Sequence, residues 1–159
     1  DRGSRVLLVD RVAERLAIGE TLGAESLLLR EGDDLVARAR GWSGVEGPEV
    51  VIEATGVPEL VQSCVELAVH AGRVVVVGLS ARPAPLQVGD TAFKELDVLG
   101  VSCCNPDEFV AAVDLVRRRR DVAAGLVTHT FALEEAPAAI EYAIAHPAEV
   151  LKAVVRLDA

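Results

Sequence analysis

The sequence contains no methionine, and its aromatic side chains amount to one tryptophan, one tyrosine and three phenylalanines. A core with so few rings has to be built from valine, leucine, isoleucine and alanine, which is typical of parallel strands that helices bury on both faces. Apolar residues make up 51% of the 159 residues, which excludes a disordered chain and suffices for one domain. The missing methionine and the opening DRGS lead us to expect a piece of a longer protein.

Long apolar runs, an excess of positive charge and an even number of cysteines are also missing. No run approaches the ~20 apolar residues of a membrane span, and we expect no signal peptide, because the opening DRGS is not followed by an apolar segment of that kind. The net charge of -9 argues against nucleic acid as a partner, and the one basic run, residues 117–120, is typical of a solvated helix end. Three cysteines make no disulfide framework, so we expect a reducing, cytoplasmic setting without membrane attachment.

Short apolar runs alternate with helical patterns along the chain. We expect strands at residues 5–10, 26–29, 50–53, 73–78 and 97–102, helices at 12–22, 35–40 and 59–69, a loop at 41–48 and a turn at 93–96. A tail of helix 105–120, strand 126–131, helix 133–145 and strand 151–157 follows. Strands that alternate with helices predict βαβ units in a doubly wound parallel sheet of the Rossmann type. We expect a partial dinucleotide-binding domain at 1–103 and a C-terminal segment at 104–159.

Details within these elements are predicted from the same patterns. Gly23 is expected to end the helix at 12–22, in which Leu16, Ala17 and Leu22 share one side. Asp33 or Asp34 is expected to cap the next helix. In the long helix 105–120, the apolar side chains expected to face inward are Phe109, Val113 and Val116.

Asp10 closes the first predicted strand. In a dinucleotide-binding fold, an acidic residue at the end of the second strand accepts hydrogen bonds from the adenosine ribose hydroxyls. The same carboxylate repels a 2′-phosphate, which favours NAD over NADP, although Arg11 and Arg15 lie close enough to weaken that exclusion. An equally good interpretation is that Asp10 caps the helix that follows it.

The phosphate-binding turn G-x-G-x-x-G is not in the sequence, in which Gly3 is the only glycine before Asp10. We therefore expect the chain to lack the first strand, the turn and the first helix of the fold. That strand lies in the middle of the sheet, so without it two buried edges would face water, which is an aggregation hazard.

Glycines follow two of the predicted parallel strands, at residues 55–56 and 78–79. Ligands of open α/β sheets bind at the carboxyl ends of the strands, and glycine allows a flat ring to approach the backbone. Ordinary turn glycines would give the same pattern, but their placement beside Asp10 favours a ligand site.

Several segments stand in a fixed order along nearly the whole chain: VD at 9–10 with RL at 15–16 and LGA at 22–24, VIEATG at 51–56, AGRVVVVG at 71–78, FKEL at 93–96 with LG at 99–100, THTF at 128–131 with LEEAP at 133–137, and KAVV at 152–155. In this order they resemble the C-terminal, cofactor-binding half of the medium-chain dehydrogenase/reductase family, the zinc-type alcohol and polyol dehydrogenases. The resemblance implies an oxidoreductase that transfers a hydride between NAD(P) and a secondary alcohol or polyol.

The resemblance also implies roles for ten residues: Asp10 and Arg15 would hold the adenosine ribose, Thr55 and Gly56 would border the adenine, Val77, Gly78 and Leu79 would run beside the nicotinamide, the backbone of Val101 and Cys103 would meet its carboxamide, and Lys152 would approach the pyrophosphate. The family further implies a homodimer joined through the strand at 97–102. The apolar side chains of that outer strand favour the same pairing, because an exposed apolar edge invites another strand.

The zinc ligands of the family and its four-cysteine lobe have no counterpart in this sequence, so we expect no catalytic and no metal-binding residue on this chain. The full-length enzyme would bind zinc through ligands outside it, and the chain alone would be inactive. Cys103 and Cys104 cannot replace the ligands, because adjacent residues in a strand point to opposite faces. Packing is their expected role and that of Cys64, and structural roles are expected for His70, His129 and His146.

Two other kinds of protein remain open at this point. One is a nucleotide-binding module or inactive fragment without catalysis. The other is a methyltransferase, which also ends its second strand with a ribose-binding acid, although the tail does not resemble the antiparallel hairpin with which that fold finishes.

Overall fold

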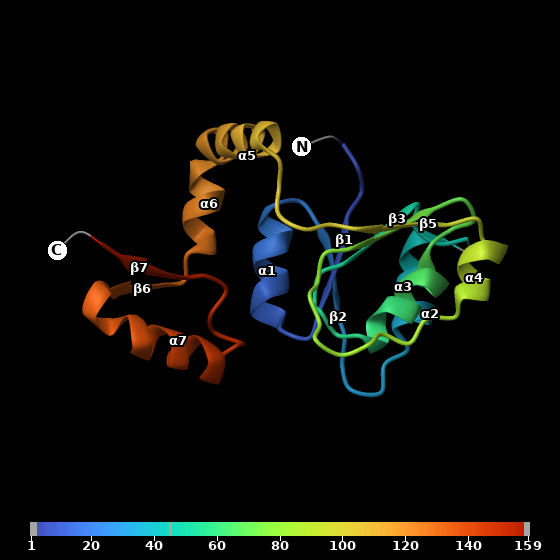
Figure 1. Ribbon diagram of the computed structural model, residues 1–159, viewed down its shortest axis with the longest axis horizontal. Helices are drawn as coiled ribbons and strands as arrows, with labels where there is room; N and C mark the ends of the chain where they lie inside the picture. The colour runs from blue at the N-terminus through green and yellow to red at the C-terminus, as the bar shows by residue number, and fades with distance from the viewer. Residues whose placement is uncertain (1–2, 45, 158–159) are drawn as a thin grey trace. The chain divides into compact units, whose positions relative to one another are not determined.

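In the computed structural model, which describes residues 3–44 and 46–157, helices and parallel strands alternate along the chain (Figure 1). Its elements are β1 (Leu7–Asp10), α1 (Ala13–Thr21), β2 (Glu25–Leu28), α2 (Leu35–Ser43), β3 (Val50–Glu53), α3 (Glu59–Leu67), β4 (Arg73–Val76), α4 (Val88–Phe93), β5 (Asp97–Gly100), α5 (Pro106–Arg118), α6 (Arg120–Leu126), β6 (His129–Ala132), the 3-10 turn η1 (Leu133–Glu135), α7 (Ala136–Ala145) and β7 (Ala153–Arg156). The strand pairings of the described residues are all parallel, which confirms the predicted α/β class.

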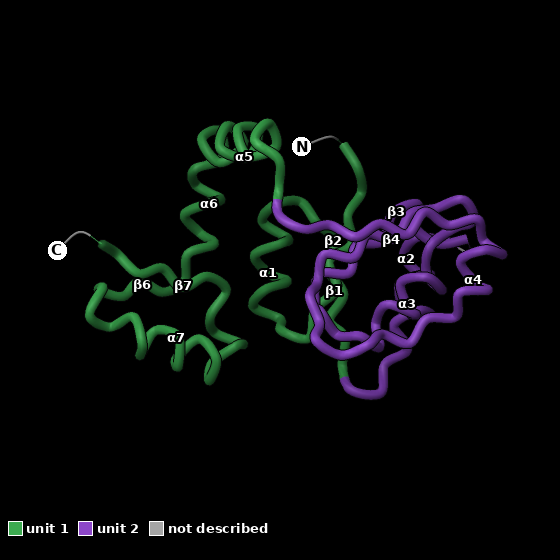
Figure 2. Tube along the Cα trace, in the orientation of Figure 1, with its two compact units in different colours: residues 1–30, 104–159 green, residues 31–103 purple. Residues whose placement is uncertain are grey.

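The chain folds into two compact units, coloured separately in Figure 2. Unit 1 consists of residues 1–30 and 104–159, and unit 2 of residues 31–103. Unit 1 holds two separate pairs of strands, β1 with β2 and β6 with β7, and unit 2 holds the sheet β3-β4-β5. In the described part of the chain, β1 and β3 each pair with one neighbour only, so each has an edge without a strand partner.

The core of unit 2 lies between α3 and one face of its sheet. Cys64, Val65 and Ala68 at the end of α3 are buried against Val74 of β4, and partly buried aliphatic side chains of β3 and β4 pack around them. The predicted packing role of Cys64 is confirmed. On the other face of β3, Ile52 is 62% exposed, so the elements of unit 2 cover only one face of this strand.

Two polar side chains fix the ends of helices in unit 2. Asp34 is the N-cap of α2 and accepts a hydrogen bond from the backbone N–H of Ala37 at 3.0 Å, as the sequence predicts. At the other end of a helix, Lys94 Nζ donates to the carbonyl oxygens of Val65, Glu66 and Ala68 at 3.0, 2.7 and 3.0 Å. A cation there neutralises carbonyl groups that have no partner in the helix, so Lys94 stabilises the end of α3.

In unit 1, α1 packs on β1, and Leu16 of this helix is 4% exposed. Gly19 faces the strand closely, and a Cβ added there would collide with the side chain of Leu8. The helix ends at Thr21, and Gly23, which has φ 89°, lies just past its C-cap, as predicted. Leu22 was predicted on the buried side but is exposed, because the helix has ended before it and Leu22 is its C-cap.

The tail of unit 1 begins with α5, whose first turn is closed by a reciprocal capping box between Asn105 and Glu108. The prediction that its apolar face turns inward is wrong for Phe109 and Val116, which are 61% and 52% exposed, whereas Val113 is partly buried. Among residues 3–44 and 46–157, no element buries these two side chains. No helix among residues 3–44 and 46–157 is long and apolar enough to cross a membrane.

Three helical segments differ from their predicted extent. α2 continues to Ser43 into the predicted loop 41–48, of which Val45 lies outside the described residues. Where only a turn at 93–96 was expected, the six-residue α4 precedes it, and the seven-residue α6 replaces the start of the strand predicted at 126–131. Helices this short complete fewer than two turns at 3.6 residues each, so no apolar period marks them in a sequence.

Candidate cofactor site

Asp10 is the last residue of β1 and its side chain is 27% exposed. Its Oδ1 accepts a hydrogen bond from the backbone N–H of Val12 at 2.9 Å, which fixes the turn between β1 and α1. The N-cap of α1 is Val12, so Asp10 is not the capping residue of that helix. The carboxylate therefore lies at the carboxyl end of a parallel strand, where ligands of open α/β sheets bind.

Arg15, in the first turns of α1, lies beside this carboxylate. Its Nη1 is 3.8 Å from Asp10 Oδ2, and its Nη2 donates to the carbonyl oxygen of Pro147, which follows α7 in the same unit. The Nε of Arg15 has no hydrogen-bond partner within the described residues. The carboxylate and guanidinium together offer acceptors and donors to a polyhydroxyl group.

Lys152 also belongs to unit 1 and lies just before β7. Its backbone is held by Thr128, whose N–H donates to the Lys152 carbonyl oxygen at 3.0 Å and whose Oγ1 accepts from the Lys152 N–H at 3.3 Å. The residue is exposed at the surface. Among the described residues, no hydrogen bond or ion pair joins Lys152 to Asp10 or Arg15.

In unit 2 a buried carboxylate organises the turn after β3. Glu53 is 3% exposed, and its Oε1 accepts hydrogen bonds from the backbone N–H groups of Thr55 at 2.7 Å and Gly56 at 3.1 Å, and from the Thr55 hydroxyl. We predict no role for Glu53 from the sequence. The signal that could have revealed it is a single acidic residue at the end of an otherwise apolar strand.

The turns after β3 and β4 lie in contact at the carboxyl edge of the sheet. Gly56 has φ 73°, and a Cβ added there would collide with the carbonyl oxygen of Leu79. A Cβ on Gly78 would meet the backbone nitrogen of Gly56 and the carboxylate of Glu53. The structure thus brings together the predicted residues Thr55, Gly56, Gly78 and Leu79, and only glycine fits at the two closest points.

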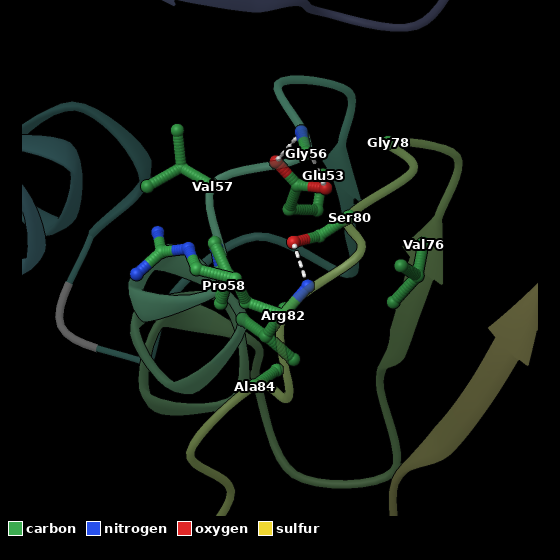
Figure 3. Close-up of a pocket in the computed structure, with 10 residues that line it drawn as sticks. Glu53, Gly56, Val57, Pro58, Val76, Gly78, Ser80, Arg82 and Ala84 are labelled. Atoms are coloured by element: carbon green, nitrogen blue, oxygen red, sulfur yellow. Dashed lines mark hydrogen bonds between the residues drawn. The ribbon is translucent and has the colours of Figure 1, made fainter.

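A cavity of about 180 Å³ opens at this edge (Figure 3). Glu53, Gly56 and Gly78 line its sheet side, and Arg82 lines it from the loop after β4. The backbone N–H of Arg82 donates to Ser80 Oγ at 3.1 Å, which Figure 3 shows as a dashed line. The cavity is too small for a dinucleotide, but a glycine-lined edge of this kind accepts part of a flat ring.

The guanidinium of Arg82 is paired with Glu59 at the start of α3, through two hydrogen bonds of 3.1 and 3.3 Å. A hydrogen bond from its own backbone N–H and then the pairing with Arg82 lower the pKa of Glu59, which favours the charged carboxylate. Arg82 and Ser80 are residues of this edge that the sequence did not reveal, because they lie in a loop without periodic pattern.

Val101 and Cys103 follow β5. The N–H of Val101 donates to the carbonyl oxygen of Val76 at 3.0 Å, which extends the pairing with β4 by one bond. Cys103 has φ 58° and is exposed, as is Cys104. The prediction that these two cysteines pack in the core is wrong, because β5 has ended at Gly100 and the chain leaves the sheet before reaching them.

The described histidines pack against aromatic rings and take no part in a metal cluster. Within residues 3–44 and 46–157, no three His, Cys, Asp or Glu side chains lie close enough together to hold a metal ion. His129 stacks beside Phe131 and contacts Tyr142, and His146 stacks on Tyr142 with ring centroids 4.1 Å apart. His70 contacts Phe93 edge-on. The three histidines therefore have aromatic partners.

Comparison with known proteins places these features in one family. Residues 1–118 match the family model described as zinc-binding dehydrogenase. An uncharacterized zinc-type alcohol dehydrogenase-like protein of Haemophilus influenzae is 29% identical over 150 residues, which are 94% of this chain and 44% of that protein. Sorbitol dehydrogenase of Rattus norvegicus is 32% identical over 144 residues, 88% of this chain and 40% of that protein.

Solved structures agree with the sequence matches. The 2R,3R-butanediol dehydrogenase of Bacillus subtilis superposes with a TM-score of 0.84 at 27% identity, over 97% of this chain and 44% of that one. An alcohol dehydrogenase of a Thermus species superposes with a TM-score of 0.79 at 31% identity, over 94% and 43%. The chain thus spans less than half of the length of the proteins that it matches.

Proposed function

Because the chain belongs to the zinc-binding dehydrogenase family, we propose that it is the cofactor-binding half of an oxidoreductase that transfers a hydride between NAD and a secondary alcohol or polyol. The observation that carries this proposal is the Asp10 carboxylate at the end of β1, fixed on one oxygen by Val12 and approached on the other by Arg15. The substrate class follows from relatives named sorbitol and butanediol dehydrogenase.

Each part of the cofactor has proposed partners on this chain. The ribose hydroxyls donate to Asp10 beside Arg15, Thr55 and Gly56 border the adenine, and the nicotinamide lies along Val77, Gly78 and Leu79. The backbone of Val101 and Cys103 meets the carboxamide, and Lys152 approaches the pyrophosphate. NAD supplies the hydride acceptor when bound, and these residues bind and orient it.

NAD is the proposed cofactor rather than NADP, because the Asp10 carboxylate repels a 2′-phosphate at the ribose. Arg15 reduces that repulsion, since its Nη1 lies 3.8 Å from the carboxylate. We expect a preference for NAD and not an absolute exclusion of NADP.

We also propose which part of the full-length protein each segment of this chain belongs to. Residues 1–103 would bind the cofactor, and residues 104–159 would belong to the catalytic domain of the relatives. Zinc, its ligands and the catalytic residues would lie outside this chain, and the chain alone would be inactive. The odd number of free cysteines supports a reducing, cytoplasmic setting.

A homodimer through β5 completes the proposal. Within the described residues β5 pairs with β4 alone, and its Val98 and Leu99 and the following Val101 are each more than two-fifths exposed. A strand with an open, apolar edge is a template for a second copy. Two copies of β5 would join their sheets into one.

Titration of the isotope-labelled chain with NAD, NADPH and S-adenosylmethionine tests the function, because chemical-shift changes report weak binding residue by residue. We expect NAD to shift the backbone signals of Asp10, Val12 and Gly56, and NADPH to bind more weakly. Preferential binding of S-adenosylmethionine would support a methyltransferase instead. Shifts confined to residues away from Asp10 and Gly56 would overturn the proposed site.

A further inference from the structure

The chain passes from unit 2 to unit 1 between two adjacent cysteines, Cys103 and Cys104. Both residues are exposed and both are free thiols. Cys103 has φ 58°, in the left-handed region that residues with a side chain rarely adopt. Since β5 ends at Gly100, the alternation of side chains along a strand does not hold the two thiols on opposite faces.

We propose that Cys103 and Cys104 form a redox-active thiol pair that hydrogen peroxide or another hydroperoxide converts into a disulfide between adjacent residues. One sulfur attacks the peroxide, whose O–O bond breaks, and becomes a sulfenic acid, while water leaves from hydrogen peroxide or an alcohol from an organic hydroperoxide. The second sulfur then attacks it, the S–S bond forms, the S–O bond breaks and water leaves. Two electrons pass from the two sulfurs to one peroxide.

The disulfide would open again readily. Disulfides normally join Cα atoms that are about 4.4–6.8 Å apart, whereas adjacent Cα atoms are separated by about 3.8 Å across a trans peptide bond. The bond is therefore strained, and strained, exposed disulfides are the ones that small thiols reduce. This favours a reversible modification over a permanent link.

The third cysteine provides an internal contrast. Cys64 is 6% exposed in the core of unit 2. Burial and the nearby negative charge of Glu53 raise the pKa of its thiol to about 11, so it stays protonated and shielded. Since the thiolate is the reacting form, oxidation should select the exposed pair.

Peptide mapping after limited peroxide treatment of the folded chain tests the proposal. Trypsin cleaves after Lys94 and Arg117, which places both cysteines in the peptide 95–117, while Cys64 lies in the peptide 41–73. We expect the mass of peptide 95–117 to fall by two hydrogen atoms and the peptide to stop reacting with iodoacetamide. Dithiothreitol should restore both the mass and the reactivity. Peptide 41–73 should remain able to react after denaturation.

Three variants test which cysteines form the disulfide. Cys103→Ser and Cys104→Ser should each abolish the loss of two hydrogen atoms, whereas Cys64→Ala should leave it unchanged. The proposal is overturned if the wild-type peptide instead gains oxygen atoms on each cysteine separately, forms disulfides only between chains, or stays reduced while a free cysteine standard is oxidised.

A consequence for cofactor binding rests on the proposed function, which assigns the Cys103 backbone to the carboxamide. The disulfide restricts that backbone, so the oxidised chain should bind NAD roughly three- to tenfold more weakly, as when one or two hydrogen bonds are lost. Dithiothreitol should restore binding. If the disulfide forms while NAD binding is unchanged, the contact of Cys103 with the cofactor is wrong and the redox pair stands.

Discussion

At the scale of single residues, the turn after β3 depends on one buried carboxylate. Glu53 accepts hydrogen bonds from Thr55 and Gly56 and is nearly inaccessible. The sequence predicted the strand at 50–53 from its apolar run, and Gly56 as a site residue from its place after that run. It could not predict the burial of Glu53, because a carboxylate is almost always exposed unless its surroundings supply donors, and those come from the folded turn.

Replacing Glu53 by glutamine tests this dependence. The amide group that replaces one carboxylate oxygen must face the N–H of Gly56, so one accepted hydrogen bond becomes a contact between two donors. We expect the free energy of unfolding to fall by about 1–3 kcal/mol, measured by urea denaturation. Glu49→Gln, at an exposed residue just before the same strand, should change it by less than about 0.5 kcal/mol. An equal effect of both substitutions would contradict the account.

Cys64 should make stability depend on alkaline pH. Its pKa is raised from 9.0 to about 11 in the folded state, mainly by burial, so the unfolded chain loses this proton first. The stabilisation is therefore complete below pH 9.0 and is lost as the pH rises towards about 11. Wild type should lose roughly 2–3 kcal/mol more than Cys64→Ala over that interval in urea denaturation. Parallel curves for the two proteins would show that the thiol is not protected.

At the scale of elements, the long apolar patterns were predicted well and the short helices were not. The strands in the core of unit 2 are predicted by the apolar runs at 50–53 and 73–78. These runs are apolar because side chains of both strands are buried against α3. The six-residue α4 depends instead on tertiary contacts, such as the hydrogen bond of 2.9 Å from Gln62 Nε2 to Asp90 Oδ2. Contacts between distant residues leave no periodic signal.

The contact between the turns after β3 and β4 predicts a contrast between two glycines of unit 2. Gly56→Ala introduces a Cβ at φ 73° against the carbonyl oxygen of Leu79, and should lower the free energy of unfolding by about 1–3 kcal/mol. Gly89→Ala in α4 has no atom within 4 Å of the added Cβ and should raise it by about 0.5–1 kcal/mol. Thermal unfolding of both variants measures the difference, and a stabilising Gly56→Ala would refute the close approach.

At the scale of the whole molecule, the order of short segments along the sequence predicts the family. The parallel pairings and the match over residues 1–118 confirm it. The sequence could not show which surface each segment presents, since Phe109 of α5 and the pair Cys103–Cys104 are exposed where burial was expected. Those predictions rested on residue type alone, whereas exposure depends on where β5 ends and on what covers α5.

The open edge of β5 gives a prediction for the assembly. The N–H groups of Asp97 and Val101 already donate to Gly72, just before β4, and to Val76 of β4, so the donors of Val98 and Gly100 face the other edge. Val98→Pro removes an outward donor and should convert the proposed dimer to a monomer in sedimentation velocity. Val98→Ala, which keeps the donor, should remain a dimer. A dimeric Val98→Pro protein would exclude pairing through this edge.

The role of Asp10 is tested most directly by titrating NAD and NADPH into the wild-type chain and into Asp10→Asn. The wild type should bind NAD more tightly than NADPH. The substitution removes the charge that accepts from the ribose and repels the 2′-phosphate, so NAD binding should weaken by about tenfold or more while NADPH binding weakens less or improves. If the wild type binds NADPH at least as tightly as NAD, or if Asp10→Asn leaves the ratio of the two affinities unchanged, Asp10 does not hold the ribose.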